Sequence, residues 1–197
     1  MDKTEALEKI REEVSNLAES PLYAYRIDNK NYPVIGEGSI NADIMLIGEA
    51  PGKNEAETGR PFCGRSGKVL DVLLESVGIT RADVYITNIV KDRPPGNRDP
   101  LPKEIALYGP FLNRQIEIIE PKILATLGRF SMEYIMNQFD LSEEMRPIGL
   151  LHGKILTANT AYGSLTIVPL YHPAVAVYNS KMIDVLKEDF QTVKKSI

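Results

Sequence analysis

The chain has 197 residues, of which 43% are hydrophobic and 25% are charged, and its formal net charge is −4. This composition is typical of a globular protein, and the length suits one compact domain, which we expect to cover residues 1–197. No apolar stretch approaches the roughly 20 residues that span a bilayer, and the charged first residues lack the apolar core of a signal peptide. We therefore expect a cytoplasmic protein with no membrane partner. We also expect a monomer, although nothing in the sequence tests this. The single cysteine, Cys63, allows no internal disulfide and cannot build a structural metal site alone.

Apolar periodicity predicts helices and strands that alternate along the chain. The expected helices cover about residues 3–19, 66–77, 103–119, 131–137 and 181–195. The expected strands cover about residues 43–48, 84–90, 122–127, 155–157 and 165–170. The segment 21–41 is predicted to be a loop, and residues 139–153 give no clear pattern. Alternating strands and helices indicate βαβ units, so we expect an α/β fold, a three-layer α/β/α sandwich around a mostly parallel sheet.

Two polar segments directly follow apolar strands. Residues 48–52, Gly-Glu-Ala-Pro-Gly, follow the first strand and continue through Glu55 to Phe62, and His172 follows the last strand. In open α/β sheets, ligands bind in the crevice outside the carboxyl ends of the strands. We therefore expect the two segments to meet in one pocket that holds carboxylates, an aromatic ring and an imidazole.

The residue types in these segments suit chemistry on a planar base. The glycines allow close approach of a ligand, although an ordinary strand-to-helix turn would contain them too. Glu49 and Glu55 can activate a water, or be solvated surface charges. Phe62 can stack on a base, or fill a small apolar gap under the loop. Asn88 offers an amide that pairs with a base edge, or caps its strand. His172 can stabilise an anion on a leaving group, or be a structural histidine.

Basic side chains surround both loops, although the net negative charge gives no hint of a nucleic-acid partner. Around the first loop they are Arg60, Arg65 and Lys68, and along the proline-rich segment 93–100 they are Lys91, Arg93 and Arg98. They are candidates for contacts with phosphates, and a solvated charged face is the alternative. Neither a P-loop nor a dinucleotide-binding glycine pattern is present in the sequence.

Four segments together resemble the uracil-DNA glycosylase superfamily, most closely its family 4. They are residues 48–70 (GEAPGKNEAETGRPFCGRSGKVL), 84–105 (VYITNIVKDRPPGNRDPLPKEI), 124–129 (LATLGR) and 172–174 (HPA). The resemblance implies one α/β/α domain around a four-stranded, mostly parallel sheet. It also implies a monofunctional enzyme of base excision repair that flips uracil out of single- or double-stranded DNA and hydrolyses its bond to the sugar, without a metal or redox cofactor in the reaction.

The resemblance and the basic residues together give the expected site. The expected catalytic residues are Glu49, Glu55 and His172. The expected substrate-binding residues are Gly48, Ala50, Pro51, Gly52, Phe62 and Asn88. The expected DNA-binding residues are Arg60, Arg65, Lys91, Arg93, Pro94, Pro95, Val177 and Tyr178. Other branches of the superfamily carry Asp or Asn at the position of Ala50, which cannot activate a water, so the resemblance shifts that role to Glu49, Glu55 and His172.

Two features depart from the family pattern. Family 4 enzymes hold a [4Fe–4S] cluster on four cysteines, and the corresponding positions here are Ser20, Tyr23, Asp92 and Tyr108. Because thiolates are the usual cluster ligands, we expect no iron–sulfur cluster and no other cofactor. Relatives also carry leucines and an arginine after HPA, where this chain has Val177 and Tyr178. These departures leave two alternatives open: a relative that binds a base or damaged DNA with weak or no cleavage, and a glycosylase for another deaminated base, such as hypoxanthine or xanthine.

Overall fold

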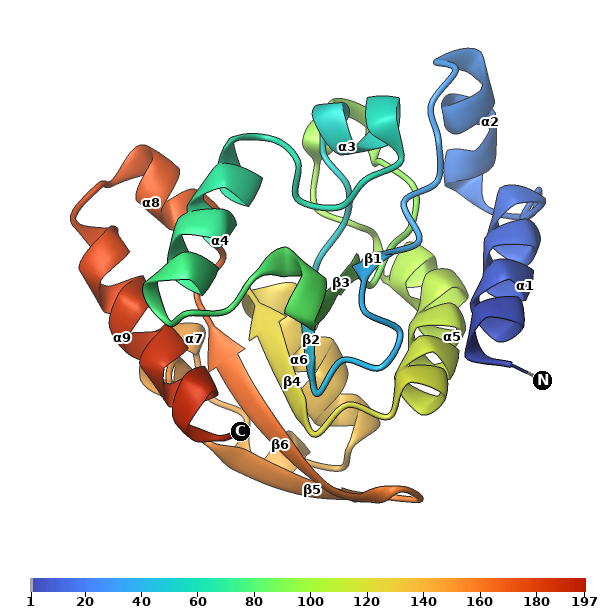
Figure 1. Cartoon of the computed structure of the whole chain (residues 1–197). Helices are drawn as coiled ribbons and strands as arrows, with labels where there is room; N and C mark the ends of the chain where they lie inside the picture. Colours follow the sequence, from blue (N-terminus) through green and yellow to red (C-terminus); the bar gives the residue numbers. More distant parts are fainter. Residues whose placement is uncertain (1) are drawn as a thin grey trace.

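The computed structural model describes residues 2–197, and over this range one sheet has six strands in the order β1-β3-β2-β4-β6-β5 (Figure 1). In chain order the strands are β1 (Glu37–Gly38), β2 (Ile44–Gly48), β3 (Val84–Asn88), β4 (Ile123–Leu127), β5 (Leu156–Thr160) and β6 (Gly163–Leu170). The central strands β3, β2, β4 and β6 run parallel, whereas β1 and β5 pair antiparallel at the two edges. The sheet is therefore larger than the four strands expected, although its parallel part has four.

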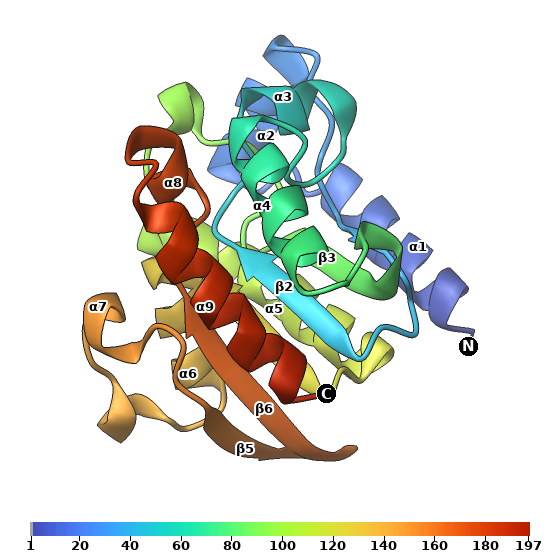
Figure 2. The same cartoon turned by 60° about the vertical axis from the view of Figure 1, so that its left-hand side comes forward.

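Helices cover both faces of the sheet, which confirms the predicted three-layer α/β/α sandwich. Helices α4 (Arg65–Ser76) and α9 (Met182–Lys195) lie across one face, in front of the sheet in Figure 2. Helices α5 (Pro102–Ile119), α6 (Arg129–Gln138) and α7 (Ile148–Leu151) cover the opposite face. Helix α1 (Lys3–Ser15) packs outside α5. The shorter helices are α2 (Pro21–Asp28), α3 (Lys53–Thr58) and α8 (Ala174–Tyr178).

The apolar strands explain this arrangement. All five residues of each of β2, β3 and β4 are buried, as expected for parallel strands covered on both faces. Successive side chains point to opposite faces: Met45 and Ile47 join the core under α5 and α6, while Ile44 and Leu46 join the core under α4 and α9. The parallel direction brings the carboxyl ends of β2, β3 and β6 to the same edge of the sheet.

The segment 21–41, expected to be a loop, begins with helix α2 instead. The Ser20 hydroxyl accepts a hydrogen bond from the Leu22 amide at 3.1 Å, and Pro21 occupies the first helical position. Both are standard signals of a helix start. Within residues 2–197, no helix combines the length and apolarity required to cross a membrane.

Candidate active site

A cavity of about 310 Å³ opens where β2, β3 and β6 end. It brings together nine of the residues predicted from the sequence: Glu49, Ala50, Pro51, Gly52, Glu55, Phe62, Asn88, Pro94 and His172. The sequence did not indicate three further lining residues, Ser66, Asn97 and Ala174, and it indicated a fourth, Arg98, only as a candidate for a contact with phosphate. The cavity therefore combines segments that are more than 120 positions apart in the sequence.

Phe62 and His172 face each other in this cavity. Their ring centroids lie 5.6 Å apart with an angle of 31° between the ring planes. Gly48, the last residue of β2, makes this packing possible, because a β-carbon added there would collide with the Phe62 ring and the Asn88 amide oxygen. Gly48 thus supports the site through the space it leaves rather than through a contact of its own.

His172 is a neutral hydrogen-bond donor. Burial lowers the pKa of its imidazole to about 4, against a smaller opposing effect from Glu55. Its Nδ1 accepts a hydrogen bond from the Ala174 amide at 3.1 Å. Because a neutral imidazole carries one proton, that proton lies on Nε2, the other ring nitrogen. The ring therefore donates through Nε2 without having to carry a positive charge.

Glu49 carries a carboxyl that is only partly ionised near neutral pH. Burial raises its pKa to about 7, the charge of Asp99 adds to this rise, and Arg129 opposes it. A carboxylate with a pKa near the working pH is well suited to accept a proton from water. Perturbed carboxyls in a cavity are also typical of functional sites.

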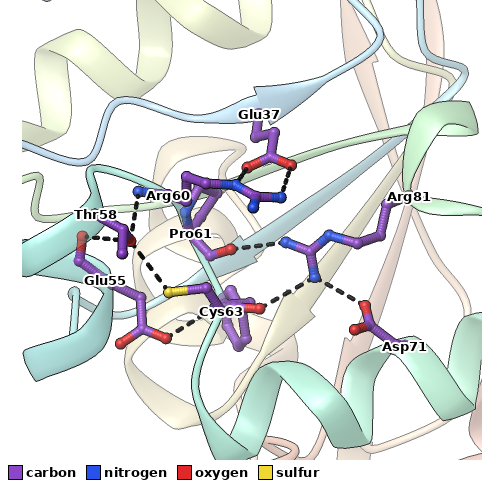
Figure 3. A network of polar contacts seen from close by, with 9 residues as sticks. Glu37, Glu55, Thr58, Arg60, Pro61, Cys63, Asp71 and Arg81 are labelled. Atoms are coloured by element: carbon purple, nitrogen blue, oxygen red, sulfur yellow. Dashed lines mark hydrogen bonds and ion pairs between the residues drawn. The ribbon is translucent and has the colours of Figure 1, made fainter.

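Glu55 holds the loop that carries Phe62. Its Oε1 accepts a hydrogen bond from the Cys63 amide at 2.9 Å (Figure 3). The same oxygen accepts a second hydrogen bond from the Gly64 amide at 2.8 Å. Gly64 caps the N-terminus of α4, where a carboxylate is also favoured by the helix dipole. One oxygen of this predicted catalytic residue is therefore committed to the backbone, and only the other remains for a reacting group.

The prediction that Lys91 contacts DNA is wrong. Its side chain is completely buried, and its ammonium donates to Thr87 Oγ1 at 2.8 Å, to the Asn88 carbonyl at 2.6 Å and to Gln115 Oε1 at 2.5 Å. Burial also lowers the pKa of Lys91 far below its usual value. Lys91 supports the end of β3 from inside the protein and has no surface to offer a phosphate.

The other predicted DNA-binding residues differ in their exposure and in whether their side chains already have a partner within the protein. Arg65, Pro95 and Tyr178 are exposed, with Tyr178 at 82% exposure, and Val177 is half-buried on α8. Arg60 is exposed but pairs with Glu37 at 2.8 and 2.9 Å. Half-buried Arg93 donates to Asn97 Oδ1 at 2.6 Å.

A buried polar network lies between α1, α2 and α5, and we call it the α2 network. It consists of Ser20, Arg26, Asp92 and Tyr108. Arg26 Nη1 lies 3.1 and 3.2 Å from the two oxygens of Asp92, and the guanidinium also donates to the carbonyls of Val14 and Ser15. The Tyr108 hydroxyl lies 2.6 Å from Asp92 Oδ2 and 2.7 Å from Ser20 Oγ. Three of these residues occupy positions that the family resemblance assigns to cluster ligands.

Comparison with known proteins points to one family. The family model described as the uracil DNA glycosylase superfamily matches residues 35–194. Several relatives carry the name type-4 uracil-DNA glycosylase. The protein from Saccharolobus solfataricus is 45% identical over 97% of this chain and 86% of its own, and that from Sulfurisphaera tokodaii is 42% identical over 97% and 84%. The Archaeoglobus fulgidus protein is 38% identical over 96% of this chain and 92% of its own.

Proposed function

The chain belongs to the uracil-DNA glycosylase superfamily, and we propose that it removes uracil from DNA by hydrolysing the N-glycosidic bond and leaving an abasic site. The observation that carries this proposal is the convergence of three groups on one cavity. They are the Phe62 ring, the Asn88 amide and the neutral His172 imidazole. They supply a stacking face, an amide that pairs with a base edge, and a donor for the charge that the leaving base acquires.

The size of the cavity supports a small planar ligand. Its volume of about 310 Å³ lies at the lower end of the range of about 300–1,000 Å³ that is usual for ligand sites. A base enters such a cavity only after it leaves the DNA stack, which costs a few kcal/mol for a paired base. Stacking on Phe62 and hydrogen bonds to Asn88 offset this cost. DNA is therefore the partner, and uracil is the base that we propose it releases.

In the proposed reaction, the bond from C1′ of the sugar to N1 of uracil breaks, and both bonding electrons leave with the base. The negative charge spreads from N1 onto a carbonyl oxygen of the base, where the Nε2–H of His172 donates a hydrogen bond. Preorganised donors of this kind contribute about 3 to 4 kcal/mol to transition-state stabilisation in comparable sites. The neutral state of His172 suits this role, because the donor needs no proton from solvent.

A water then adds to C1′ and gives up a proton. Glu49 is the proposed acceptor, because its carboxyl lines the cavity and its raised pKa of about 7 keeps it basic enough at neutral pH. Ala50 has no group for this task, and one oxygen of Glu55 already binds the backbone of residues 63 and 64. We assign Glu55 chiefly to holding the loop.

We also propose that DNA runs past the rim of the cavity. Exposed Arg60 and Arg65 flank the loop that carries Phe62, and Arg93 and Pro95 are the sequence neighbours of Pro94, which lines the cavity; these positions support this path. Guanidinium groups in these places suit phosphate oxygens. Val177 and exposed Tyr178 on α8 are the proposed wedge that fills the space left by the base.

We propose that the protein holds no iron–sulfur cluster. The positions assigned to the ligands carry hydroxyl, phenol and carboxylate groups, and the carboxylate of Asp92 is occupied by Arg26 and Tyr108. This donor set does not fit a cluster that binds thiolates. A colourless preparation without iron or sulfide is expected, and a brown preparation that contains both would contradict the proposal. A single domain, a monomeric state and a cytoplasmic location remain predictions.

The decisive experiment is cleavage of oligonucleotides that contain one uracil, as single strands and as duplexes, followed by alkaline cleavage of abasic sites. The protein is made in a host without uracil-DNA glycosylase activity, and Asn88→Ala, which removes the base-pairing amide, serves as the matched control. Cleavage at uracil that falls at least tenfold in the variant is expected. Abasic sites only at hypoxanthine or xanthine would redirect the proposal to another base. Tight binding without cleavage would indicate a binding protein.

A further inference from the structure

Phe62 has an unusual backbone conformation for a residue that must present a flat ring. Its φ angle is +48°, in the left-handed region that bulky residues rarely adopt. Residues in such conformations persist only when the surrounding structure holds them there. Phe62 is nevertheless only 6% exposed, and its ring faces that of His172 in the cavity. Something other than the residue's own preference must fix this conformation.

Two side chains of opposite charge, Glu55 and Arg81, form hydrogen bonds to the backbone on the two sides of Phe62. On one side, the Glu55 carboxylate accepts from the amides of Cys63 and Gly64. On the other, the Arg81 guanidinium donates to the carbonyl of Pro61 at 2.7 Å and to that of Phe62 at 3.1 Å. Figure 3 shows Glu55 and Arg81 on opposite sides of the segment that contains Pro61 and Cys63.

Arg81 is itself fixed in place. It begins a short 3₁₀ helix, Arg81–Asp83, which Asp83 closes by accepting from the amide and hydroxyl of Thr80 at 2.8 and 2.7 Å. Its Nη1 also donates to Asp71 on α4 at 2.9 Å. The Phe62 carbonyl lies so close to α4 that a β-carbon at Gly67 would collide with it. The guanidinium is thus held between α4 and the loop.

From this geometry we propose that Arg81 is a positioning residue for catalysis. It lies outside the cavity lining, and it acts by holding the Pro61 and Phe62 carbonyls so that the Phe62 ring presents its face beside His172. Two separate Nη groups bind two carbonyls, a fork that lysine cannot reproduce. The inference rests on the proposed function, because the base that stacks on Phe62 is the uracil of that proposal.

The test is a double-mutant cycle on the single-turnover rate of uracil release at saturating enzyme. Arg81→Gln is expected to lower this rate by about 10- to 100-fold, the size of effect that a small misplacement of a binding group produces. In a Phe62→Ala background the same change is expected to alter the rate less than twofold, because the ring that Arg81 positions is gone. An equal loss in both backgrounds, or no loss in either, would overturn the proposal.

Two further variants separate positioning from folding. Arg146→Gln is the matched control, since Arg146 also donates to two carbonyls, those of Glu143 and Met145, on an exposed segment. It is expected to leave the rate unchanged. Arg81→Lys keeps the charge and can donate to one of the two carbonyls. Its rate should therefore lie about midway, on a logarithmic scale, between those of Arg81→Gln and the wild type. If Arg81→Lys released uracil no faster than Arg81→Gln, the role of the carbonyl contacts would be contradicted.

A readout without substrate distinguishes failure of this inference from failure of the proposed function. The protein has two histidines, so the ring protons of His172 are readily assigned by NMR. The Phe62 ring at 5.6 Å shifts those resonances through its ring current. Arg81→Gln should move the His172 resonances towards their positions in Phe62→Ala, and Arg146→Gln should not. Unmoved resonances in Arg81→Gln would overturn the inference even if the wild type cleaves uracil-containing DNA.

Discussion

The polar side chains of the cavity at the ends of β2, β3 and β6 are mostly half-buried, whereas those of the α2 network are fully buried, and the hydrogen bonds of the two regions go to different places. In the α2 network, Arg26, Asp92, Tyr108 and Ser20 bind one another and nearby carbonyls. In the cavity, His172 uses Nδ1 internally and leaves the Nε2 proton for a ligand. Buried polar groups stabilise a fold when their partners are internal, and they serve binding when a partner is still to come.

The largest expected effect breaks the α2 network. Asp92→Ala leaves the Arg26 guanidinium buried without its counter-charge, since Asp92 is 1% and Arg26 3% exposed. Removal of one partner of a buried ion pair costs about 3–5 kcal/mol of the free energy of unfolding. Chemical denaturation measures this loss. The uracil-release rate per folded molecule should not change, because none of the hydrogen bonds of the network goes to a residue that lines the cavity.

The control for this change is Asp43→Ala. Asp43 forms an ion pair with Lys122 at 3.0 Å, but both side chains are more than half exposed. An exposed pair contributes at most about 1 kcal/mol, so this variant should be almost as stable as the wild type. If Asp92→Ala were no less stable than Asp43→Ala, the α2 network would not be a structural unit.

The second prediction concerns the cavity, where a substitution should lower the rate and leave the stability almost unchanged. His172→Ala should lower the uracil-release rate by about a hundredfold, the cost of losing one donor to a developing anion. The free energy of unfolding should change little in comparison. His152→Ala is the matched control: His152 pairs with Asp189 at 2.9 Å and stacks on Tyr171, so its loss should lower stability and leave the rate of folded enzyme intact. A similar loss of rate in both variants would contradict the proposal that His172 donates a hydrogen bond to the leaving base.

The third prediction concerns how kcat/KM depends on pH through the ionisation of Glu49. Only the carboxylate form of Glu49 can accept a proton from water, and its pKa is about 7. As pH rises from 5 towards about 7, kcat/KM should increase about tenfold per unit, and above that pH it should be constant. His172, with a pKa of about 4, stays neutral throughout this range.

Matched glutamates test the assignment. Glu49→Gln should abolish this dependence on pH, whereas Glu57→Gln, which removes an exposed carboxylate of α3 that pairs with Lys53, should preserve it. A wild-type profile that is flat between pH 5 and 8 would exclude Glu49 as the base.

The cavity was predictable from the sequence to the extent that local rules govern it. β2 and β3 are short, fully buried strands that begin with apolar residues, and parallel strands bring their ends together. That reasoning brought Glu49 and His172 to one cavity, which Asn88, at the end of β3, also lines. The contribution of Phe62 also required knowledge of a left-handed φ angle, which the sequence does not reveal for a phenylalanine.

The errors concern contacts between residues far apart in the chain. Lys91 follows a strand and precedes a proline-rich loop, so its charge suggested the surface, but its partner Gln115 lies 24 residues away on α5. Arg81 reaches back about 20 residues to Pro61 and Phe62, and no local pattern predicts this. Helix α2 is different: Ser20 and Pro21 are readable start signals that the surrounding tyrosines and asparagines obscured.

The smallest expected effect concerns Tyr178, which belongs neither to the cavity lining nor to the α2 network. Tyr178 is 82% exposed on α8, so its ring is available to fill the gap that a flipped base leaves in a duplex. Tyr178→Ala should lower the rate on duplex DNA about threefold and leave the rate on single strands unchanged, because a single strand leaves no paired stack to hold open. Ile155→Ala, which removes an exposed apolar side chain before β5, should affect neither substrate. An equal loss on both substrates would show that Tyr178 binds the strand rather than replaces the base. The wedge would then be supplied by Val177 alone, and duplex cleavage would depend mainly on how firmly Phe62, Asn88 and His172 hold the extruded base.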